Sequence, residues 1–381
     1  MTDKEHALGG FLSKIADELN ISPTMQEKAI TSYDAVGKWI GDGLNYEVKI
    51  MPQGSMNLGT VVRPIDDSDD GYDMDLVCLL KNGQYLTLWQ IKNLVGDRLK
   101  EHAIYKKKLD EEGKRCWTMN YDGFHMDILP AVPKNFTFTK PNFTAIKLTH
   151  KNDSGEYEER YSDPSQYHQW FKDCMKDILL IEKRAFAAKA NTEIDKVPTY
   201  KMRTPLQKTI QLLKRHRDIC FQNNDEDAPI SIIITTLAAS SYRGETDLYE
   251  ALCNILDKMP EYIEYRNGVY WVENPVMREE NFADKWNQKS SKKDAFYNWV
   301  AQARRDIIET PLECFGIDEI ARQLGERLGN APVNRAAKEM GNQARSTRQA
   351  GGLYVKGLTG GLSTTASVGS KVVKEHTFFG K

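Results

Sequence analysis

The sequence predicts an α+β protein with two lobes, a mixed-sheet lobe and a helical lobe, followed by a flexible C-terminal tail. Alternating apolar residues and hairpin signals gather in residues 1–163, and apolar residues at helical spacing dominate residues 164–328. From residue 329 to 381, Gly, Ser, Thr and Ala prevail and large apolar residues are sparse. A chain of 381 residues also exceeds one ordinary core. We therefore expect three parts with these boundaries.

The composition predicts a globular protein of the cytoplasm. Apolar residues make up 40% and charged residues 28%, and the formal net charge of −2 creates no overall attraction to nucleic acid. The 6 cysteines show neither a CxxC pair nor Cys/His spacing, which argues against structural zinc and a disulfide framework. The N-terminus lacks the features of a signal peptide, and no apolar run reaches the ~18 residues of a membrane span.

The first lobe should contain helices and a sheet. The expected elements are an N-terminal helix opened by Ser22-Pro23 and closed by Gly41 and Gly43, a strand from Tyr46 to Met51, an amphipathic helix from Leu86 to His102, and strands from Lys114 to Tyr121 and Phe124 to Val132. Asp122-Gly123 between the last two strands is a strong hairpin signal, so these strands should pair.

The second lobe should be mostly helical. The expected helices run from Ser165 to Asn191, Thr204 to Phe221, Pro229 to Tyr242, Thr246 to Met259, Arg278 to Glu309 and Leu312 to Leu328, with a short hairpin at Arg266-Asn267-Gly268. A functional site is expected between the two lobes. The segment from Gly329 onward buries too little apolar surface to offset its ordering entropy, so we expect a flexible, weakly basic tail.

The carboxylates of the first lobe carry the strongest chemical signal. Asp73 and Asp75 alternate in an apolar run, so on a strand they face the same side. Two adjacent carboxylates repel each other unless a positive group lies between them. Asp127 lies in a second apolar run, which the hairpin would place in the same sheet. Three carboxylates on neighbouring strands can bind two Mg²⁺ ions, and the Gly54-Ser55 turn can hold the phosphates that those ions bridge.

These acidic residues allow two other interpretations. An exposed edge strand would also tolerate Asp73 and Asp75, but an apolar strand has no structural use for the unpaired carboxylate of Asp127. The acidic loop at 63–71 resembles the start of a calcium loop. Its twelfth position is Val77 instead of Glu, so a solvated loop is the better interpretation.

A family resemblance becomes visible in these motifs. QGS-x3-GT-x2-RP followed by DMD is similar to the polymerase β-type nucleotidyltransferases, and more closely to the bacterial cGAS/DncV-like nucleotidyltransferases, or CD-NTases. Lys214 in Leu-Leu-Lys-Arg, followed by Ser231, resembles the pair that holds the nucleotide triphosphate in that family. Asn274-Pro275 and the run from Glu280 to Trp286 resemble an element of its helical domain. Residues 45–290 carry the resemblance.

The resemblance implies a two-metal nucleotidyltransferase. Asp73, Asp75 and Asp127 would be the catalytic metal ligands for two Mg²⁺ ions, with Mn²⁺ as a substitute. Gly54 and Ser55 would contact the triphosphate, with Lys214 and Ser231 as further nucleotide ligands. For those last two residues a solvated lysine and a helix-start serine remain alternatives. His125 is expected to be a neighbour of the site and not a catalyst.

The family makes cyclic di- or trinucleotide second messengers that activate an antiphage effector, a system called CBASS. ATP and other NTPs are therefore the expected substrates. A linear oligoadenylate or tRNA-end nucleotidyltransferase and a catalytically silent nucleotide-binding scaffold are the alternatives. The chain has no Cys/His cluster like the zinc insertion of animal relatives, so activation by nucleic acid is not expected.

The C-terminal sequence Phe378-Phe379-Gly380-Lys381 resembles family members whose C-terminus is attached to targets by an E1–E2-like conjugating enzyme. A plain disordered tail explains the same residues equally well.

Overall fold

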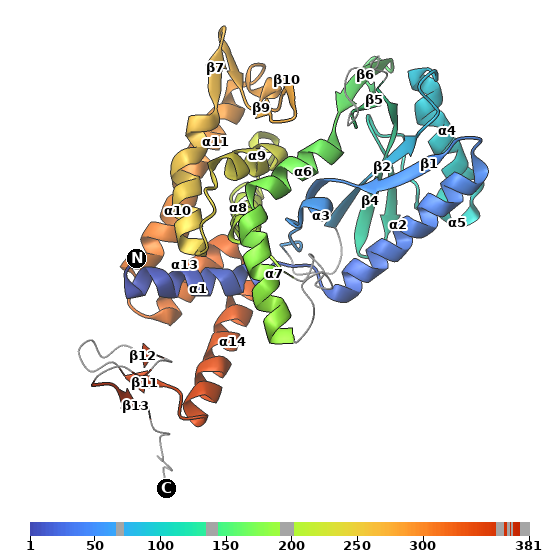
Figure 1. Ribbon diagram of the computed structural model, residues 1–381. Helices are drawn as coiled ribbons and strands as arrows, with labels where there is room; N and C mark the ends of the chain where they lie inside the picture. Colours follow the sequence, from blue (N-terminus) through green and yellow to red (C-terminus); the bar gives the residue numbers. More distant parts are fainter. Residues whose placement is uncertain are drawn as a thin grey trace.

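The computed structural model describes residues 1–65, 72–134, 144–190, 202–355, 362–363, 366 and 369–373. The acidic loop at 66–71 and the last residues, 374–381, lie outside the described residues. The two-lobed α+β architecture is confirmed, with a sheet lobe and a helical lobe side by side (Figure 1). Among the described residues, no helix is both long and apolar enough to cross a membrane.

A six-stranded mixed sheet forms the first lobe. Its strands are β1 (Val48–Pro52), β2 (Tyr72–Leu80), β3 (Trp117–Tyr121), β4 (Phe124–Pro133), β5 (Ile146–Lys151) and β6 (Tyr157–Ser162). The order is β1-β2-β4-β5-β6, and β3 pairs with the first half of β4. The predicted hairpin at Asp122-Gly123 is confirmed, because Tyr121 pairs with Phe124. Strands β2 and β4 are parallel neighbours in the middle of the sheet.

Helices α2 (Pro23–Gly43) and α4 (Leu88–Glu101) cover one face of this sheet (Figure 1). Alternate residues of β2, from Tyr72 to Leu80, point into this core, as the alternation of the sequence predicts. Asp73 and Asp75 therefore lie on the other face, toward the helical lobe. Ser22 caps α2 and Thr87 caps α4, and each side chain accepts a backbone N–H of the first turn.

The helical lobe contains the predicted helical region and, in addition, helix α1 from the N-terminus. Its helices are α1 (Asp3–Glu18), α6 (Pro164–Cys174), α7 (Lys176–Ala190), α8 (Pro205–Cys220), α9 (Ser231–Ser241), α10 (Leu248–Lys258), α11 (Ser290–Arg304), α12 (Thr310–Glu313) and α13 (Ile317–Leu328). The prediction that residues 1–163 all belong to the sheet lobe is wrong for α1. Phe11, Leu12 and Ile15 are buried in one core with α8, α10 and α13.

Two helix predictions in this lobe need correction. Residues 165–191 break at Met175 into α6 and α7. The helix expected from Arg278 starts only at Ser290, because β9 (Glu273–Asn274) and β10 (Met277–Asn281) form a ribbon beside the predicted hairpin β7 (Glu264–Arg266) and β8 (Val269–Trp271). The Asn281 side chain bonds the backbone of Val272 and Tyr270, in competition with a helical arrangement.

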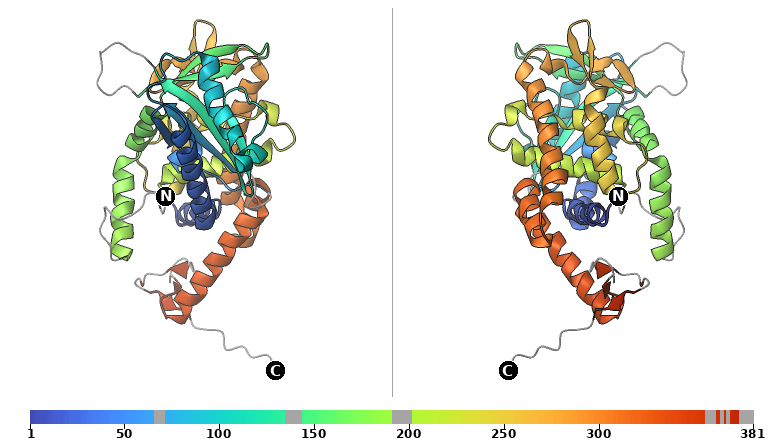
Figure 2. Two further views of the ribbon diagram at one scale, coloured as in Figure 1. Left: turned by 90° about the vertical axis from the view of Figure 1, so that its right-hand side faces the viewer. Right: turned by 90° about the vertical axis from the view of Figure 1, so that its left-hand side faces the viewer.

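The flexible tail was predicted to begin at Gly329, but residues 330–349 form helix α14 (Asn330–Gln349). Val333 and Ala336 are fully buried in the helical core, and Arg335 Nε donates to Glu18 on α1 at 2.6 Å. Figure 2 shows α14 leading away from the body toward the small strands β11 (Tyr354–Val355), β12 (Leu362–Ser363) and β13 (Lys371–Val372). A helix face of small residues suffices for this packing.

One face of α8 holds the chain between residues 58 and 64, here called the 58–64 segment. Gln207 donates to the Leu58 carbonyl at 2.8 Å, Gln211 to the Val61 carbonyl at 2.7 Å, and Arg215 to the Arg63 and Pro64 carbonyls. These donors recur every four residues, so they lie on one side of the helix. The segment connects the sheet lobe to the helical lobe through these backbone contacts.

Candidate active site

A cavity of about 450 Å³ lies where β2 and α3 (Gly54–Leu58) meet α8 and α9. Six of the seven predicted site residues line it: Gly54, Ser55, Asp73, Asp75, Lys214 and Ser231. The seventh, Asp127, is the register partner of Asp75 on the parallel strand β4. Residues separated by up to 177 positions in the chain therefore meet in one place.

Two of the three carboxylates, Asp73 and Asp75, have a raised pKa. Burial, followed by repulsion from Asp127 and Asp73, raises the pKa of Asp75 to about 6. Burial and the charge of Asp127 also raise the pKa of Asp73. Lys214 opposes both shifts without cancelling them. The protein's own side chains therefore supply too little positive charge to keep the pKa of Asp73 and Asp75 at its ordinary value.

The backbone of α3 makes room for one of these carboxylates. Gly54 has φ +59, in the left-handed region that favours glycine. A Cβ atom added there would lie 2.2 Å from Oδ2 of Asp75. The predicted Gly-Ser turn is thus the first turn of a short helix, and its glycine is needed for both conformation and space. Gln53 N–H donates to the Asp75 carbonyl at 2.8 Å and fixes the approach of α3 to β2.

Asp127 is held by the opposite strand of its hairpin. Thr118 lies directly across from it on β3, and its hydroxyl donates to Oδ1 of Asp127 at 2.6 Å. His125, two residues earlier, has Nδ1 2.7 Å from Oδ1 of Asn120. The imidazole of His125 thus has a structural partner.

Lys214 lies at the back of the cavity. Its Nζ donates to the carbonyl of Thr60 at 3.1 Å, within the 58–64 segment. Burial, with the Arg217 charge next, lowers the pKa of Lys214 to about 8. Asp218, Asp75 and Asp73 favour its charged form. Lys214 is therefore no solvated surface lysine, and it can present an ammonium group to an anion that enters the cavity.

Arg217 connects Lys214's helix to Ser231. Its Nη1 donates to the Ser231 hydroxyl oxygen at 3.1 Å and to the Pro229 carbonyl at 2.8 Å. Ser231 is the first residue of α9, so the hydroxyl lies at a helix start and at the cavity edge.

Carboxylate oxygens are the ligands that Mg²⁺ prefers, and the raised pKa of Asp73 and Asp75 shows that a cation would relieve their repulsion. Gly54 leaves the Asp75 carboxylate accessible from the cavity side. The donor set of Asp73, Asp75 and Asp127 therefore fits a divalent metal site.

A second cluster of metal-binding residue types lies in the helical lobe, at His216, Cys220 and Asp306. Trp299 Nε1 donates to His216 Nδ1 at 3.1 Å, so Nε2 carries the hydrogen that it donates to Asp306 across 3.0 Å. Both nitrogens of the imidazole are engaged. We assign this cluster a structural role.

Two residues at the site were missed from the sequence. Thr118 follows from hairpin register, because a two-residue turn at Asp122-Gly123 sets it opposite Asp127. Arg217 lies three residues after Lys214, hence on a neighbouring part of the same helix surface. Its bond to Ser231 had no local signal, because it spans the end of α8 and the start of α9.

Comparison with known proteins agrees with this geometry. Residues 48–130 match the family model described as cyclic GMP-AMP synthase DncV-like, nucleotidyltransferase domain. A c-di-GMP synthase of Roseivirga ehrenbergii is 31% identical over 385 residues, covering 97% of this chain and 96% of that protein. The cyclic dinucleotide synthase CdnG of Bradyrhizobium diazoefficiens is 22% identical over 406 residues, covering 98% of this chain and 95% of that protein.

Among solved structures, the fold is similar to the CD-NTase CdnG of Bradyrhizobium diazoefficiens in complex with GTP. The TM-score is 0.71 at 21% identity, and the match covers 88% of this chain and 99% of that one. The family model covers the strands that carry Asp73, Asp75 and Asp127. The full-length relative extends the match across the helical lobe. The chain therefore belongs to the bacterial cGAS/DncV-like nucleotidyltransferases, the CD-NTases.

Proposed function

We propose that this protein joins purine nucleoside triphosphates, GTP and ATP, into a cyclic di- or trinucleotide. The observation that carries the proposal is the pairing of Asp75 with Asp127 beside Asp73, facing a cavity that also contains Gly54 and Lys214. The full-length relative named c-di-GMP synthase supports a cyclic product and makes GTP the first substrate to test. ATP follows from the family resemblance.

The residues divide into two groups by chemistry. Lys214, Ser231 and Ser55, which line the cavity, would donate hydrogen bonds to the triphosphate of one NTP, and Gly54 would let the α3 backbone approach it. Asp73, Asp75 and Asp127 would hold two Mg²⁺ ions, or Mn²⁺ in their place. Bound there, these ions would supply Lewis-acid polarisation and neutralise charge on the leaving pyrophosphate. Thr118 keeps Asp127 in one orientation.

In each condensation, a ribose hydroxyl oxygen of one nucleotide forms a bond to the α-phosphorus of the other. The bond from that phosphorus to the pyrophosphate oxygen breaks, and pyrophosphate leaves. Asp127, the register partner of Asp75, would accept the hydroxyl proton. A first condensation makes a linear intermediate, and the last one, within the same molecule, closes the ring.

We also propose the biological setting of the family. The product would act as a second messenger that activates an antiphage effector, and the enzyme would work in the cytoplasm without nucleic-acid activation. Conjugation of the C-terminus by an E1–E2-like enzyme stays a prediction, because residues 374–381 lie outside the described part of the chain.

Mass spectrometry of the products tests the proposal. The protein is incubated with GTP, ATP, both, or all four NTPs in Mg²⁺, and the products are treated with phosphatase or phosphodiesterase. A product that resists phosphatase but is cleaved by phosphodiesterase is expected. The double variant Asp73→Asn/Asp75→Asn is the control, and it should lose at least about a hundredfold in rate.

Other results would favour the alternatives. If every product keeps a phosphatase-sensitive end, the protein is a linear oligoadenylate or tRNA-end nucleotidyltransferase. If no NTP is consumed and the double variant retains biological activity, the protein is a nucleotide-binding scaffold.

A further inference from the structure

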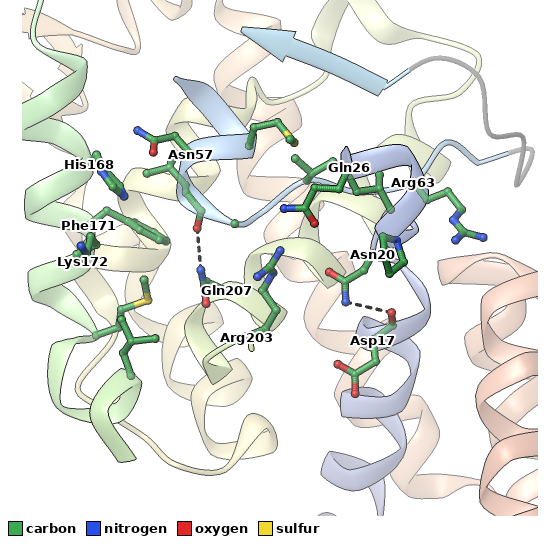
Figure 3. Close-up of a pocket in the computed structure, with 18 of the residues that line it drawn as sticks. Asp17, Asn20, Gln26, Asn57, Arg63, His168, Phe171, Lys172, Arg203 and Gln207 are labelled. Atoms are coloured by element: carbon green, nitrogen blue, oxygen red, sulfur yellow. Dashed lines mark hydrogen bonds between the residues drawn. The ribbon is translucent and has the colours of Figure 1, made fainter. Parts of the chain in front are cut away.

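A second cavity, of about 810 Å³, adjoins the candidate active site. It is bounded by α6, α7, the start of α8 and the link between α1 and α2 (Figure 3). Leu58, Val61 and Arg63 line both cavities, so the 58–64 segment separates them. Helix α3 gives Gly54 and Ser55 to the active-site cavity, but Met56 and Asn57 to this one. Its volume is in the range of small-molecule sites.

The lining of this cavity is cationic. Lys172 and His168 lie one turn apart on α6, and Arg203 precedes α8 across from them (Figure 3). Within the part of the chain that the structure describes, the Lys172 ammonium group has no hydrogen bond or ion pair with a protein group. Burial, and then the Lys172 charge, lowers the pKa of His168 and so favours the neutral form of its imidazole. It can therefore donate or accept a hydrogen bond beside the Lys172 ammonium group.

Among the described residues of the lining, acidic side chains are fewer than basic ones. The Asp17 carboxylate acts on the charge of Arg203, and it also pairs with Lys208 at 2.8 Å. Glu27 lines the opposite rim with an exposed side chain. The cavity therefore differs from the active site, where three carboxylates gather. It suits an anion that arrives without a metal ion.

The rest of the lining is apolar or amide. Phe171, Met175, Leu179 and Phe186 form a continuous wall from α6 and α7. Asn57 on α3 and Gln26 on α2 bring amide groups to the lining (Figure 3). An apolar wall accepts a planar ring, amides bond its polar edge, and cations bind an attached phosphate. These are the three chemical parts of a nucleotide.

We propose that this cavity is a second binding site, for a nucleotide-type organic phosphate that regulates the enzyme. Its ring would lie on the α6–α7 wall and its phosphate at Lys172 and Arg203. The two sources of such a ligand are an NTP and the cyclic dinucleotide product. Binding in this cavity is independent of the proposed function, whereas its regulatory consequence depends on that function.

Occupancy would reach the active site through the 58–64 segment. Gln207 lines this cavity and donates to the Leu58 carbonyl, and a Cβ on Gly59 would lie 2.5 Å from Gln207 Nε2. Because the packing here is close, a ligand that contacts Gln207 or Gly59 would either displace the 58–64 segment or bind only in a conformation that this segment allows. The next residue, Thr60, carries the carbonyl that Lys214 binds in the active-site cavity.

Isothermal titration calorimetry of the full-length protein in the presence of EDTA tests whether the second cavity binds such a ligand. Removing Mg²⁺ suppresses binding to the carboxylate cluster, and c-di-GMP, GTP and ATP are titrated separately to identify the source. We expect at least one of them to bind. Lys172→Glu should weaken that binding about tenfold or more, whereas Lys176→Glu, an exposed lysine at the start of α7, should not.

A second pair of variants assigns the binding to one cavity. Asn57→Asp should also weaken it, because it places a negative charge in the second cavity, and Ser55→Ala should leave it unchanged. Melting curves confirm that each variant is folded. No binding of any probe in EDTA, or binding that Ser55→Ala abolishes and Lys172→Glu spares, would overturn the proposal. A protein that makes no cyclic product but binds these probes would refute only the proposed function.

Discussion

Arg217 donates a hydrogen bond to the Ser231 hydroxyl oxygen across 3.1 Å and so ties the last turn of α8 to the first residue of α9. Its own Nε donates to Asp218 at 2.6 Å, which holds the guanidinium in place. Because the serine oxygen accepts from Arg217, the O–H hydrogen is left to donate elsewhere, and the cavity lies beside it. Arg217 is therefore a positioning residue for a triphosphate donor.

The effects of substituting Arg217 and Ser231 on NTP binding should be strongly coupled, because the two side chains share one hydrogen bond. Arg217→Met and Ser231→Ala should each raise KM for the NTP about tenfold, and the double variant should be little worse than either single variant. Steady-state KM and kcat for all three variants measure this. The exposed Arg322→Met on α13 is the control. Multiplicative effects in the double variant would show that the two residues act separately.

Gly54→Ala should abolish most activity in a folded protein. The added Cβ would lie 2.2 Å from Oδ2 of Asp75 and would require φ +59 of an alanine. The carboxylate must then move, which should reduce kcat by about a hundredfold or more. Gly10→Ala on α1 meets open space and should stabilise the protein by up to about 1 kcal/mol. Near-normal kcat in Gly54→Ala would mean that the position of Asp75 is not critical.

The buried Lys92 side chain should make the free energy of unfolding depend on pH. It is fully buried on α4 and donates to the carbonyls of Gly113 and Cys116. Burial lowers the pKa of Lys92 from 10.5 to about 8, so between these values the unfolded chain binds a proton that the folded protein does not. The contribution of Lys92 to the free energy of unfolding therefore rises with pH through this window.

Chemical denaturation of wild type and Lys92→Met at pH 7, 8, 9 and 10 measures this effect. The difference in free energy of unfolding, wild type minus variant, should increase from pH 8 to pH 10. A difference that stays constant or falls would contradict the assigned pKa shift.

Truncations separate α14 from the segment beyond it. A chain ending at residue 360 should keep full turnover in vitro and lose any covalent conjugate in cells. A chain ending at residue 329 loses the buried Val333 and Ala336 and the Arg335–Glu18 ion pair, so its melting temperature should fall by several degrees. Equal melting temperatures for both truncations would mean that α14 contributes nothing to the helical core.

The parts of the candidate site that could be predicted from the sequence are those whose geometry depends on residues close together in the chain. Alternation along β2 placed Asp73 and Asp75 on one face, and the two-residue turn before Phe124 put Asp127 in the same sheet. Both follow from strand period and hairpin register, which depend on a few consecutive residues.

Contacts between segments that are distant in the chain could not be predicted from the sequence. The partner of Lys214 is a backbone carbonyl 154 positions away, and no side-chain pattern marks a carbonyl acceptor. Helix α14 was missed because its buried residues are small and its composition is typical of a flexible segment. The strands near Asn281 were missed because their stabilising bonds come from asparagine side chains, which helical spacing does not reveal.

The inclusion of α1 in the helical core has a consequence for synthesis on the ribosome. Phe11, Leu12 and Ile15 emerge first, but their packing partners on α10 and α14 follow more than 200 residues later. The strands of the sheet pair within residues 48–162, so that lobe can fold while the helical lobe is still incomplete. We expect chains stalled after residue 190 to protect the sheet from protease and to leave α1 open to cleavage.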